Sequence, residues 1–210
     1  VVSVNMTALG KELVSDVLPI ADPYILFYND TYYAYGTSRA DGFEVYSSKD
    51  MNRGSVLRRL ALSKEDSYGD KWFWAPEVYY VEEDKKFYMF YSVEEHVCVA
   101  TSDSPLGPFV QDGKEADSRR KRNRLHPSFS IEDGKAYLYF VRFTNGNVIW
   151  CAELKDNLKE IKEETLTQCV EATEPWELVF GKVVEGPSIV KQGGLYYMFY
   201  SANDFGSQDY

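Results

Sequence analysis

The chain has 210 residues, enough for one domain with a substantial core, and 44% of them are hydrophobic and 27% charged. This composition is typical of a folded domain rather than a disordered segment. The formal net charge of −10 argues against nucleic acid or an anionic membrane as the main partner, because both attract positive charge. A neutral ligand such as a sugar is compatible with it. No run approaches the roughly 20 apolar residues of a membrane helix, and no signal segment is visible.

The three cysteines are Cys98, Cys151 and Cys169. None belongs to a C-x-x-C pair, which argues against a zinc site, and an odd number argues against a disulfide framework. We therefore expect all three to be small buried apolar residues.

One pattern organises most of the chain. After a lead-in with weak helical character at Lys11–Val17, an ionisable residue and a proline open an apolar strand, a polar turn follows, and an aromatic strand returns. The pattern recurs at residues 21–38, 75–92, 126–143 and 185–202. Each copy predicts a β-hairpin.

Outer strands are predicted after the first three hairpins, at Phe43–Ser48, Val56–Leu60, Val97–Ser102 and Asn147–Glu153. The charged segment Leu154–Glu164 predicts a short helix or a long turn. The basic run Arg119–Arg124 predicts a solvated loop, with a patch for an acidic ligand as the alternative.

The repeat spacing predicts a propeller. Aligning the returning strands on Tyr33, Tyr88, Tyr137 and Tyr197 gives spacings of 55, 49 and 60 residues. In an all-β pattern such a period indicates one four-stranded blade per copy. We predict a single propeller domain over 1–210, with blades at about 21–62, 72–112 and 125–172 and a partial blade at about 183–210. Because an open stack leaves strand edges unpaired, we expect the natural protein to continue beyond these residues.

The residue before each first strand is ionisable: Asp22, Glu77, His126 and, one residue out of step, Glu185. In a propeller the first strands line the central channel, so we expect these side chains to meet at one mouth. A turn residue that binds a free backbone N–H is the structural alternative for each. Two carboxylates facing across a pocket suit glycosidic bond cleavage, which needs one proton donor and one base or nucleophile.

Aromatic residues near this mouth would offer stacking faces for sugar rings. The candidates are Trp72, Trp74 and Phe43, with core packing as the alternative. Arg142 is expected either to reach a sugar hydroxyl or to form a structural salt bridge. His96 is expected either to line the channel or to be a satisfied strand histidine.

The ordered motifs ADPYILFYNDTYYAYGTS, DKWFWAPEVYY, SPLGPF, EDGKAYLYFVRFTNGNVIW and VVEGPSIVKQGGLYYMFYSAND together resemble glycoside hydrolase family 43. The resemblance runs from about Ile20 to Tyr210. It implies a five-bladed β-propeller, of which this chain would cover about three and a half blades. It also implies an inverting enzyme acting on xylose- or arabinose-containing plant polysaccharides, closest to the β-xylosidases and α-L-arabinofuranosidases.

The resemblance implies that Asp22 is the general base and Glu185 the general acid, at about 6.5–9.5 Å for inversion. The family's third carboxylate, which modulates the pKa of the acid, is replaced here by His126. The implied substrate-binding residues are Trp74, Glu77, Phe43 and Arg142.

The resemblance further implies a neutral oligo- or polysaccharide partner, no nucleic acid or membrane, and a secreted or periplasmic location. It implies no cofactor in this chain, although a calcium or other channel ion is compatible with a further blade. Because His126 departs from the family pattern, a non-catalytic or weakly active glycan-binding propeller is the second hypothesis. A protein-interaction propeller is the third, weaker one, since such scaffolds need no acids at these positions.

Overall fold

The computed structural model of the protein describes residues 18–51, 57–112, 124–206 and 210. Strands and three short 3-10 helices make up its regular structure in these residues, which confirms the predicted all-β class. The helical character expected at Lys11–Val17 and the basic run up to residue 123 lie outside the described residues.

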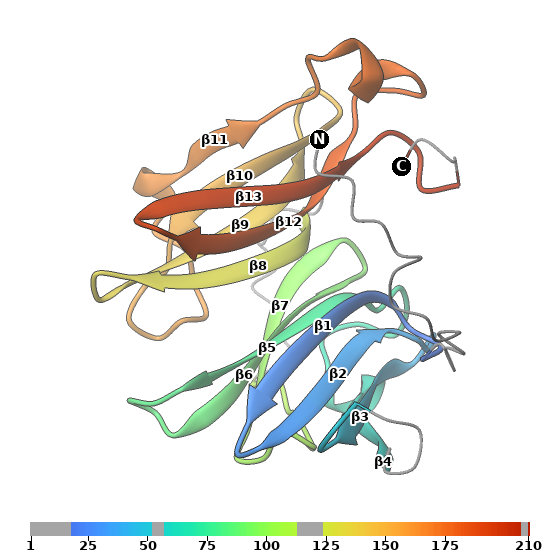
Figure 1. Ribbon diagram of the computed structural model, residues 1–210, viewed down its shortest axis with the longest axis vertical. Coiled ribbons are helices and arrows are strands. Elements are labelled where there is room, and N and C mark those ends of the chain that lie inside the picture. Colours follow the sequence, from blue (N-terminus) through green and yellow to red (C-terminus); the bar gives the residue numbers. More distant parts are fainter. Residues whose placement is uncertain (1–17, 52–56, 113–123, 207–209) are drawn as a thin grey trace, which may run out of the picture.

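The strands form four antiparallel sheets, each in chain order (Figure 1). The first sheet contains β1 (Ala21–Tyr28), β2 (Thr31–Thr37), β3 (Gly42–Ser48) and β4 (Leu57–Ser63). The second contains β5 (Trp74–Val81), β6 (Lys86–Val93) and β7 (His96–Ser102). The third contains β8 (Arg124–Glu132), β9 (Lys135–Phe143), β10 (Asn147–Glu153) and β11 (Thr167–Val170). The fourth contains β12 (Val184–Gln192) and β13 (Leu195–Ala202).

The short 3-10 helices are η2 (Lys64–Asp66), η3 (Glu163–Thr165) and η4 (Pro175–Leu178). The charged segment Leu154–Glu164, predicted as a helix or a turn, is mainly turn and ends in η3. The hydrophobic strand predicted at Val56–Leu60 corresponds to β4, which extends to Ser63. The sequence therefore predicted where the strands lie more accurately than where they end. The ends depend on backbone hydrogen bonds between strands, which side-chain patterns do not reveal.

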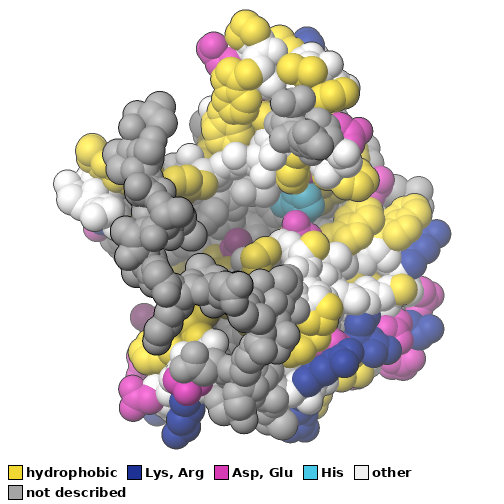
Figure 2. Space-filling view, turned by 45° about the vertical axis from the view of Figure 1, so that its right-hand side comes forward, with side chains coloured by type: hydrophobic (Ala, Val, Ile, Leu, Met, Phe, Trp, Pro, Cys, Tyr) yellow, Lys and Arg dark blue, Asp and Glu magenta, His cyan; other side chains and the backbone are white. Residues whose placement is uncertain are grey.

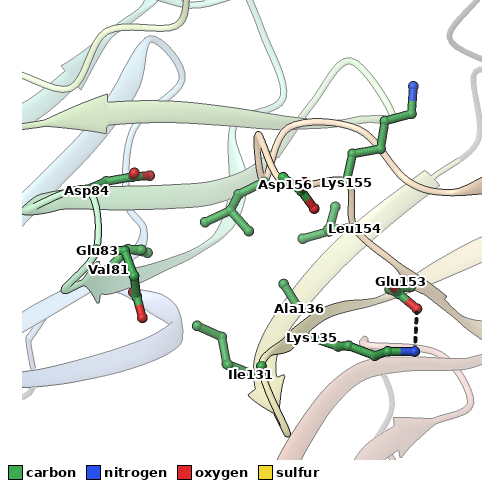
Figure 3. Close-up of a pocket in the computed structure, with 12 residues that line it drawn as sticks. Val81, Glu83, Asp84, Ile131, Lys135, Ala136, Glu153, Leu154, Lys155 and Asp156 are labelled. Carbon is green, nitrogen blue, oxygen red and sulfur yellow. Dashed lines mark ion pairs between the residues drawn. The ribbon is translucent and has the colours of Figure 1, made fainter.

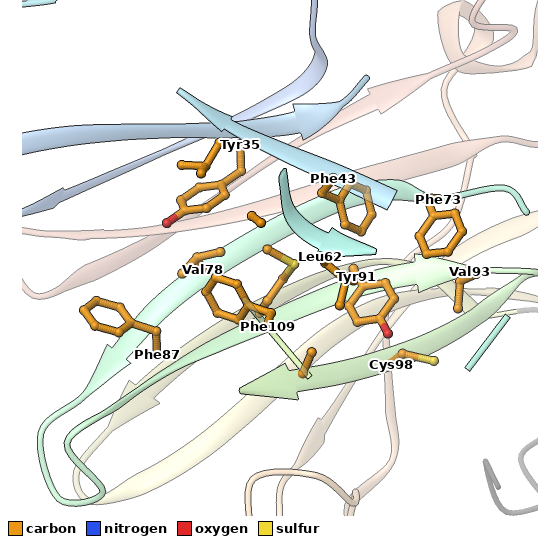
Figure 4. Packing of buried hydrophobic residues seen from close by; sticks show 14 residues of the cluster. Tyr35, Phe43, Leu62, Phe73, Val78, Phe87, Tyr91, Val93, Cys98 and Phe109 are labelled. Atoms are coloured by element: carbon orange, nitrogen blue, oxygen red, sulfur yellow. The ribbon is translucent and has the colours of Figure 1, made fainter. Parts of the chain in front are cut away.

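The hydrophobic core lies between the sheets. In β6, Phe87, Met89 and Tyr91 belong to the cluster shared with the first sheet, whereas Tyr88 and Phe90 belong to the cluster shared with the third (Figure 4 shows the first cluster). Successive side chains of a strand point to opposite faces, so a sheet buried on both faces needs apolar residues at every position. This explains the unbroken aromatic run in the second copy of the repeat.

The first strand of each sheet packs on the first strand of the next, β1 on β5, β5 on β8 and β8 on β12. A third cluster between the third and fourth sheets contains Leu125, Val141, Ile149 and Val184. Sheets stacked face to face around their first strands are the blades of a β-propeller, and the fold class predicted from the sequence is confirmed.

A close backbone contact joins the third sheet to the fourth. Gly146, in the turn before β10, has φ +82°, and a Cβ built on it would lie 2.0 Å from the carbonyl oxygen of Lys182. The next residue, Asn147, donates its backbone N–H to the same oxygen at 2.8 Å. Only glycine lets the turn approach Lys182 in this way.

Gly146→Ala should therefore destabilise the protein far more than Gly134→Ala. Gly134 has a similar φ of +74° but nothing within 4 Å of its Cβ position. An alanine there therefore adds backbone strain without a steric clash, whereas an alanine at position 146 adds both. We expect Gly134→Ala to lower the melting temperature by about 2–4 °C and Gly146→Ala by at least about twice as much. Scanning calorimetry of both variants checks this, and equal losses would show that Lys182 moves aside without cost.

Candidate active site

The first strand of every sheet begins with the same backbone irregularity. The pairing register slips between Ala21 and Tyr24 in β1, and at the corresponding places in β5, β8 and β12. At each slip a proline follows a residue with positive φ: Asp22 (48°), Ala75 (46°), His126 (49°) and Gly186 (60°). The repeat therefore carries a β-bulge, a feature that redirects side chains near functional sites.

The bulges correct the alignment made from the sequence. Counted from the proline, Asp22 and His126 are equivalent, whereas Glu185 lies one residue earlier in its strand and Glu77 two residues later. The expectation of four ionisable groups at one repeat position is thus wrong. Counting back from the aromatic strands failed because the β5–β6 turn, Glu82–Lys85, is two residues longer than the other hairpin turns.

Hydroxyl groups tie one bulge to the neighbouring blade. Thr37 Oγ1, at the end of β2, accepts the N–H of Ala75 at 2.9 Å and donates to Asp22 Oδ2 at 2.6 Å. Ser92 Oγ, at the end of β6, accepts the N–H of His126 at 2.9 Å. Thr37 therefore orients the Asp22 carboxylate, which is otherwise exposed, from across the β1–β2 hairpin.

Glu185 is only 8% exposed, yet both of its carboxylate oxygens have partners. Asn147 Nδ2 donates to Oε2 at 3.0 Å, and the Tyr210 hydroxyl donates to Oε1 at 2.9 Å. Asn147 itself is held against the strand's start by its backbone bond to Lys182. A buried carboxyl group with a fixed orientation is a requirement for directed proton transfer.

His126 lies beside this carboxyl group. Its Nδ1 is 3.9 Å from Glu185 Oε2 and is buried without a hydrogen-bond partner in the described residues. Buried polar atoms are normally satisfied, so an unsatisfied one at a cleft marks a group with a further role. Figure 2 shows a histidine with acidic side chains near it in a hollow of the face where the first strands begin.

Tyr210 connects the two catalytic candidates. Burial raises the pKa of its phenol, and the charges of Glu185 and Asp22 raise it further. Tyr210 and His126 thus both lie beside Glu185, and Asp22 stands at the start of β1.

Glu77 lies further inside, between the second and third blades. The hydroxyl of Tyr79 donates to it, as do the side chain of Ser128 and the backbone N–H of Phe129. Burial raises the pKa of the Glu77 carboxyl group to about 7, against the opposing effect of these hydrogen bonds. The partners found for Glu77 thus come from β5 and β8.

The aromatic candidates divide into surface and core. Trp72 is 47% exposed and stacks on Trp74 with ring centroids 6.0 Å apart and planes 9° from parallel. Lys71 Nζ lies 4.4 Å from the centroid of Trp72. Phe43, in contrast, is fully buried and packs edge-on against Phe73 and Tyr91, so it has no surface to offer a sugar. We withdraw Phe43 as a substrate-binding residue.

Arg142 lies with its guanidinium 4.8 Å from the ring centroid of Trp150. No ion pair of Arg142 is found within the described ranges, so a cation–π contact replaces the salt bridge considered from the sequence. His96 is buried, and its Nδ1 lies 2.7 Å from the carbonyl oxygen of Glu94. His96 is therefore a buried strand residue whose ring nitrogen is hydrogen-bonded, as the second of the two expectations has it.

A groove of about 300 Å³ lies elsewhere (Figure 3). It is lined by the β5–β6 and β8–β9 turns and the segment after β10, and Lys135 Nζ pairs with Glu153 Oε2 across it at 3.3 Å. Ile131, in its lining, is five residues beyond His126 on β8, roughly 16 Å along the strand. The groove is therefore at the opposite end of the blades from the carboxylate cluster.

In the part of the chain that the structure describes, no three His, Cys, Asp or Glu side chains gather into a metal-binding group. The same part contains no helix long and apolar enough to span a membrane.

Several residues of the site were missed from the sequence. Thr37, Ser92, Asn147 and Tyr210 all reach it from positions outside the first strands. For Thr37 and Ser92 the signal was present, because both end the aromatic strand of their repeat with a hydroxyl group. Nothing in the sequence pairs Asn147 with Glu185, which is 38 residues away.

The structure is thus a β-propeller in which Asp22, His126 and Glu185 stand near the starts of first strands. The sequence model described as Glycosyl hydrolases family 43 matches residues 18–210. The chain therefore belongs to glycosyl hydrolase family 43, and the resemblance noted in its motifs is confirmed.

Individual relatives agree with this family. A crystal structure of an endo-1,4-beta-xylanase from Bacteroides thetaiotaomicron VPI-5482 is similar with a TM-score of 0.84 and 54% identity, over 91% of this chain and 66% of that one. A beta-xylosidase of Xylanibacter ruminicola is 36% identical over 96 residues, 41% of this chain and 29% of the relative. A probable arabinan endo-1,5-alpha-L-arabinosidase B of Aspergillus fumigatus is 33% identical over 173 residues, 72% of this chain and 45% of the relative. The chain thus spans less than half the length of these two curated relatives.

Glu77 should make stability depend on pH. Burial raises the pKa of its carboxyl group from an ordinary value of 4.5 to about 7, so the folded state binds more protons between these values. The contribution of Glu77 is thus fully present below about pH 4.5 and is lost as the pH rises through 7, a change of about 2–3 kcal/mol. Melting temperatures of wild type and Glu77→Gln between pH 4.5 and 7.5 check this.

We expect Glu77→Gln to remove a fall of roughly 5–10 °C that the wild type shows over this range. Glu83→Gln, at an exposed position of the β5–β6 turn, is the control and should keep the wild-type slope. A Glu77→Gln profile parallel to that of wild type would refute the assignment.

Proposed function

We propose that the protein is an inverting glycoside hydrolase that cleaves xylosyl or arabinofuranosyl linkages in plant polysaccharides such as arabinoxylan. The observation that carries this proposal is the buried Glu185, held by Asn147 and faced by His126. Asp22, at the start of β1, is the second carboxylate of the proposal. The names of the similar xylanase, xylosidase and arabinanase support the choice of substrates. A polymeric substrate of this kind is met outside the cytoplasm, which fits a secreted or periplasmic location.

Asp22 acts as the general base in this proposal. Its Oδ2 accepts the Thr37 hydroxyl, and its exposed position leaves the second oxygen open to a water molecule. That water attacks the anomeric carbon as Asp22 takes its proton. Thr37 fixes the carboxylate in one orientation, which lowers the entropic cost of aligning the water.

Glu185 acts as the general acid. It donates its proton to the glycosidic oxygen as the bond to the anomeric carbon breaks. A leaving-group oxygen bound at Oε1 would take the place of the Tyr210 hydroxyl, while Asn147 keeps hold of Oε2.

His126 acts as a positioning residue at the place where the family has a carboxylate. The His126 imidazole, whose Nδ1 lies 3.9 Å from Glu185 Oε2, is close enough to restrict the carboxyl group's rotation. It provides no like-charge repulsion to retain the acid's proton. The stacked pair Trp72 and Trp74 offers an aromatic platform for a sugar ring, and Arg142 and Glu77 complete the proposed substrate-binding residues.

The roles of Asp22 and Glu185 can be distinguished by comparing substrates whose leaving groups do and do not need a proton. Asp22→Asn should lower kcat/KM at least about 100-fold on both xylo- or arabino-oligosaccharides and 4-nitrophenyl glycosides, because both need the activated water. Glu185→Gln should cause a similar loss on oligosaccharides and a much smaller one on nitrophenyl glycosides, whose leaving group needs no proton. Equal losses of Glu185→Gln on both substrates would contradict its role as the acid.

The first product released from a β-xyloside should be the α-anomer, as proton NMR of early time points would show. Retention of configuration would exclude the inverting mechanism. Saturable oligosaccharide binding without any released sugar would point instead to a glycan-binding propeller.

Exchanging His126 should change the pH dependence of the reaction. His126→Asp places a negative charge beside Glu185, which disfavours loss of the acid's proton. We expect the alkaline limb of kcat/KM against pH to move to higher pH in His126→Asp and to stay in place in His126→Asn. Coincident profiles of all three proteins would show that residue 126 does not act through Glu185.

A further inference from the structure

Two of the three cysteines do not behave as the sequence predicts. Cys98 is fully buried, as expected, but Cys151 is only partly buried and Cys169 is exposed. Both lie in the third sheet, Cys151 on β10 and Cys169 on the neighbouring edge strand β11. Two accessible thiols on adjacent strands can form a disulfide bond, which a single buried thiol cannot.

The strand register brings the two side chains to one face. Cys151 pairs directly with Thr167, and Cys169 is two residues beyond Thr167, so both project to the same side of the sheet. The register slips between Ile149 and Trp150, which leaves Cys169 as the extra residue of a bulge with no direct partner on β10. Its Sγ leans back to within 3.8 Å of the Thr167 carbonyl oxygen, toward the residue that faces Cys151.

The two thiols therefore lie on the same face of neighbouring strands, and Tyr139 of β9 is the direct cross-strand partner of Cys151. β11 is four residues long, mostly exposed and paired on one edge only. Such a strand can make the shift that brings the two sulfur atoms to the bond length of a disulfide.

We propose that Cys151 and Cys169 form a reversible disulfide bond between β10 and β11 when the protein meets a low-molecular-weight disulfide such as oxidised glutathione. Cys169 reacts first: its thiolate attacks one glutathione sulfur, the S–S bond of glutathione breaks, and one glutathione thiolate leaves. Cys151 then attacks the Cys169 sulfur and releases the second glutathione. Two protein thiols lose two protons and two electrons, and one glutathione disulfide becomes two glutathione thiols.

The surroundings favour this order of attack. The hydrogen bond with Cys151 lowers the pKa of the Cys169 thiol, and the same contact together with burial raises the pKa of the Cys151 thiol. The more accessible sulfur is therefore also the better thiolate. The bond would close a loop of residues 151–169 and fasten β11, the last strand before the connection that leads to Glu185.

Titration of the folded protein with oxidised glutathione tests the proposal. Free thiols counted after denaturation should fall from three to one, and peptide mapping should find Cys151 linked to Cys169. The melting temperature should rise by roughly 5–10 °C and return when dithiothreitol is added.

Matched variants sharpen the result. Cys98→Ala should still form the bond and lose both remaining thiols. Cys151→Ser should stop at a mixed disulfide on Cys169, with no gain in melting temperature, and Cys169→Ser should react slowly or not at all. A stable glutathione adduct on wild-type Cys169, a disulfide-linked dimer, or three thiols that persist in excess oxidised glutathione would each overturn the proposal.

Discussion

The bulge before the proline at the start of each inner strand is the constraint on which the site depends. Three of the four residues at this position, Asp22, Ala75 and His126, are not glycine and cost on the order of 1 kcal/mol each in a positive-φ conformation. Hydrogen bonds from the freed N–H groups of Ala75 and His126 to Thr37 and Ser92 offset part of this cost. This positive-φ conformation sets the direction in which the side chains of Asp22 and His126 leave their strands.

The position of these bulges depends in turn on the packing between blades. The second and third sheets are each covered on both faces by their neighbours, so neither can shift without disturbing two hydrophobic clusters. Close backbone contacts such as Gly146 against Lys182 fix the turns that carry polar groups toward the mouth. Asn147 reaches Glu185 only because that turn is held in place, which couples the stability of the third and fourth blades to the geometry of the acid.

Under the proposed function, His126 is the one departure from the pattern that the family resemblance implies. It occupies the bulge position equivalent to Asp22, and its Nδ1 lies 3.9 Å from Glu185 Oε2. Glu77 is engaged with Tyr79 and Ser128. Proton transfer in the proposed mechanism therefore depends on His126, Asn147 and Tyr210, the groups beside Glu185.

The sequence by itself determined the repeat, the strands and the fact that Asp22 and His126 occupy equivalent positions of two repeats. Side-chain periodicity and the proline that follows each of these residues are local signals. The sequence misplaced Glu77, since a longer hairpin turn shifts the count without changing the pattern. It placed Phe43 at the surface, although this side chain lies in the cluster between the first and second sheets. Only the tertiary structure decided which distant groups meet: Asn147 bonds Glu185, Thr37 bonds Asp22, and Cys151 and Cys169 lie on one face of neighbouring strands. Those contacts arise from the stacking of blades and the register of neighbouring strands, which join residues that no short-range pattern relates.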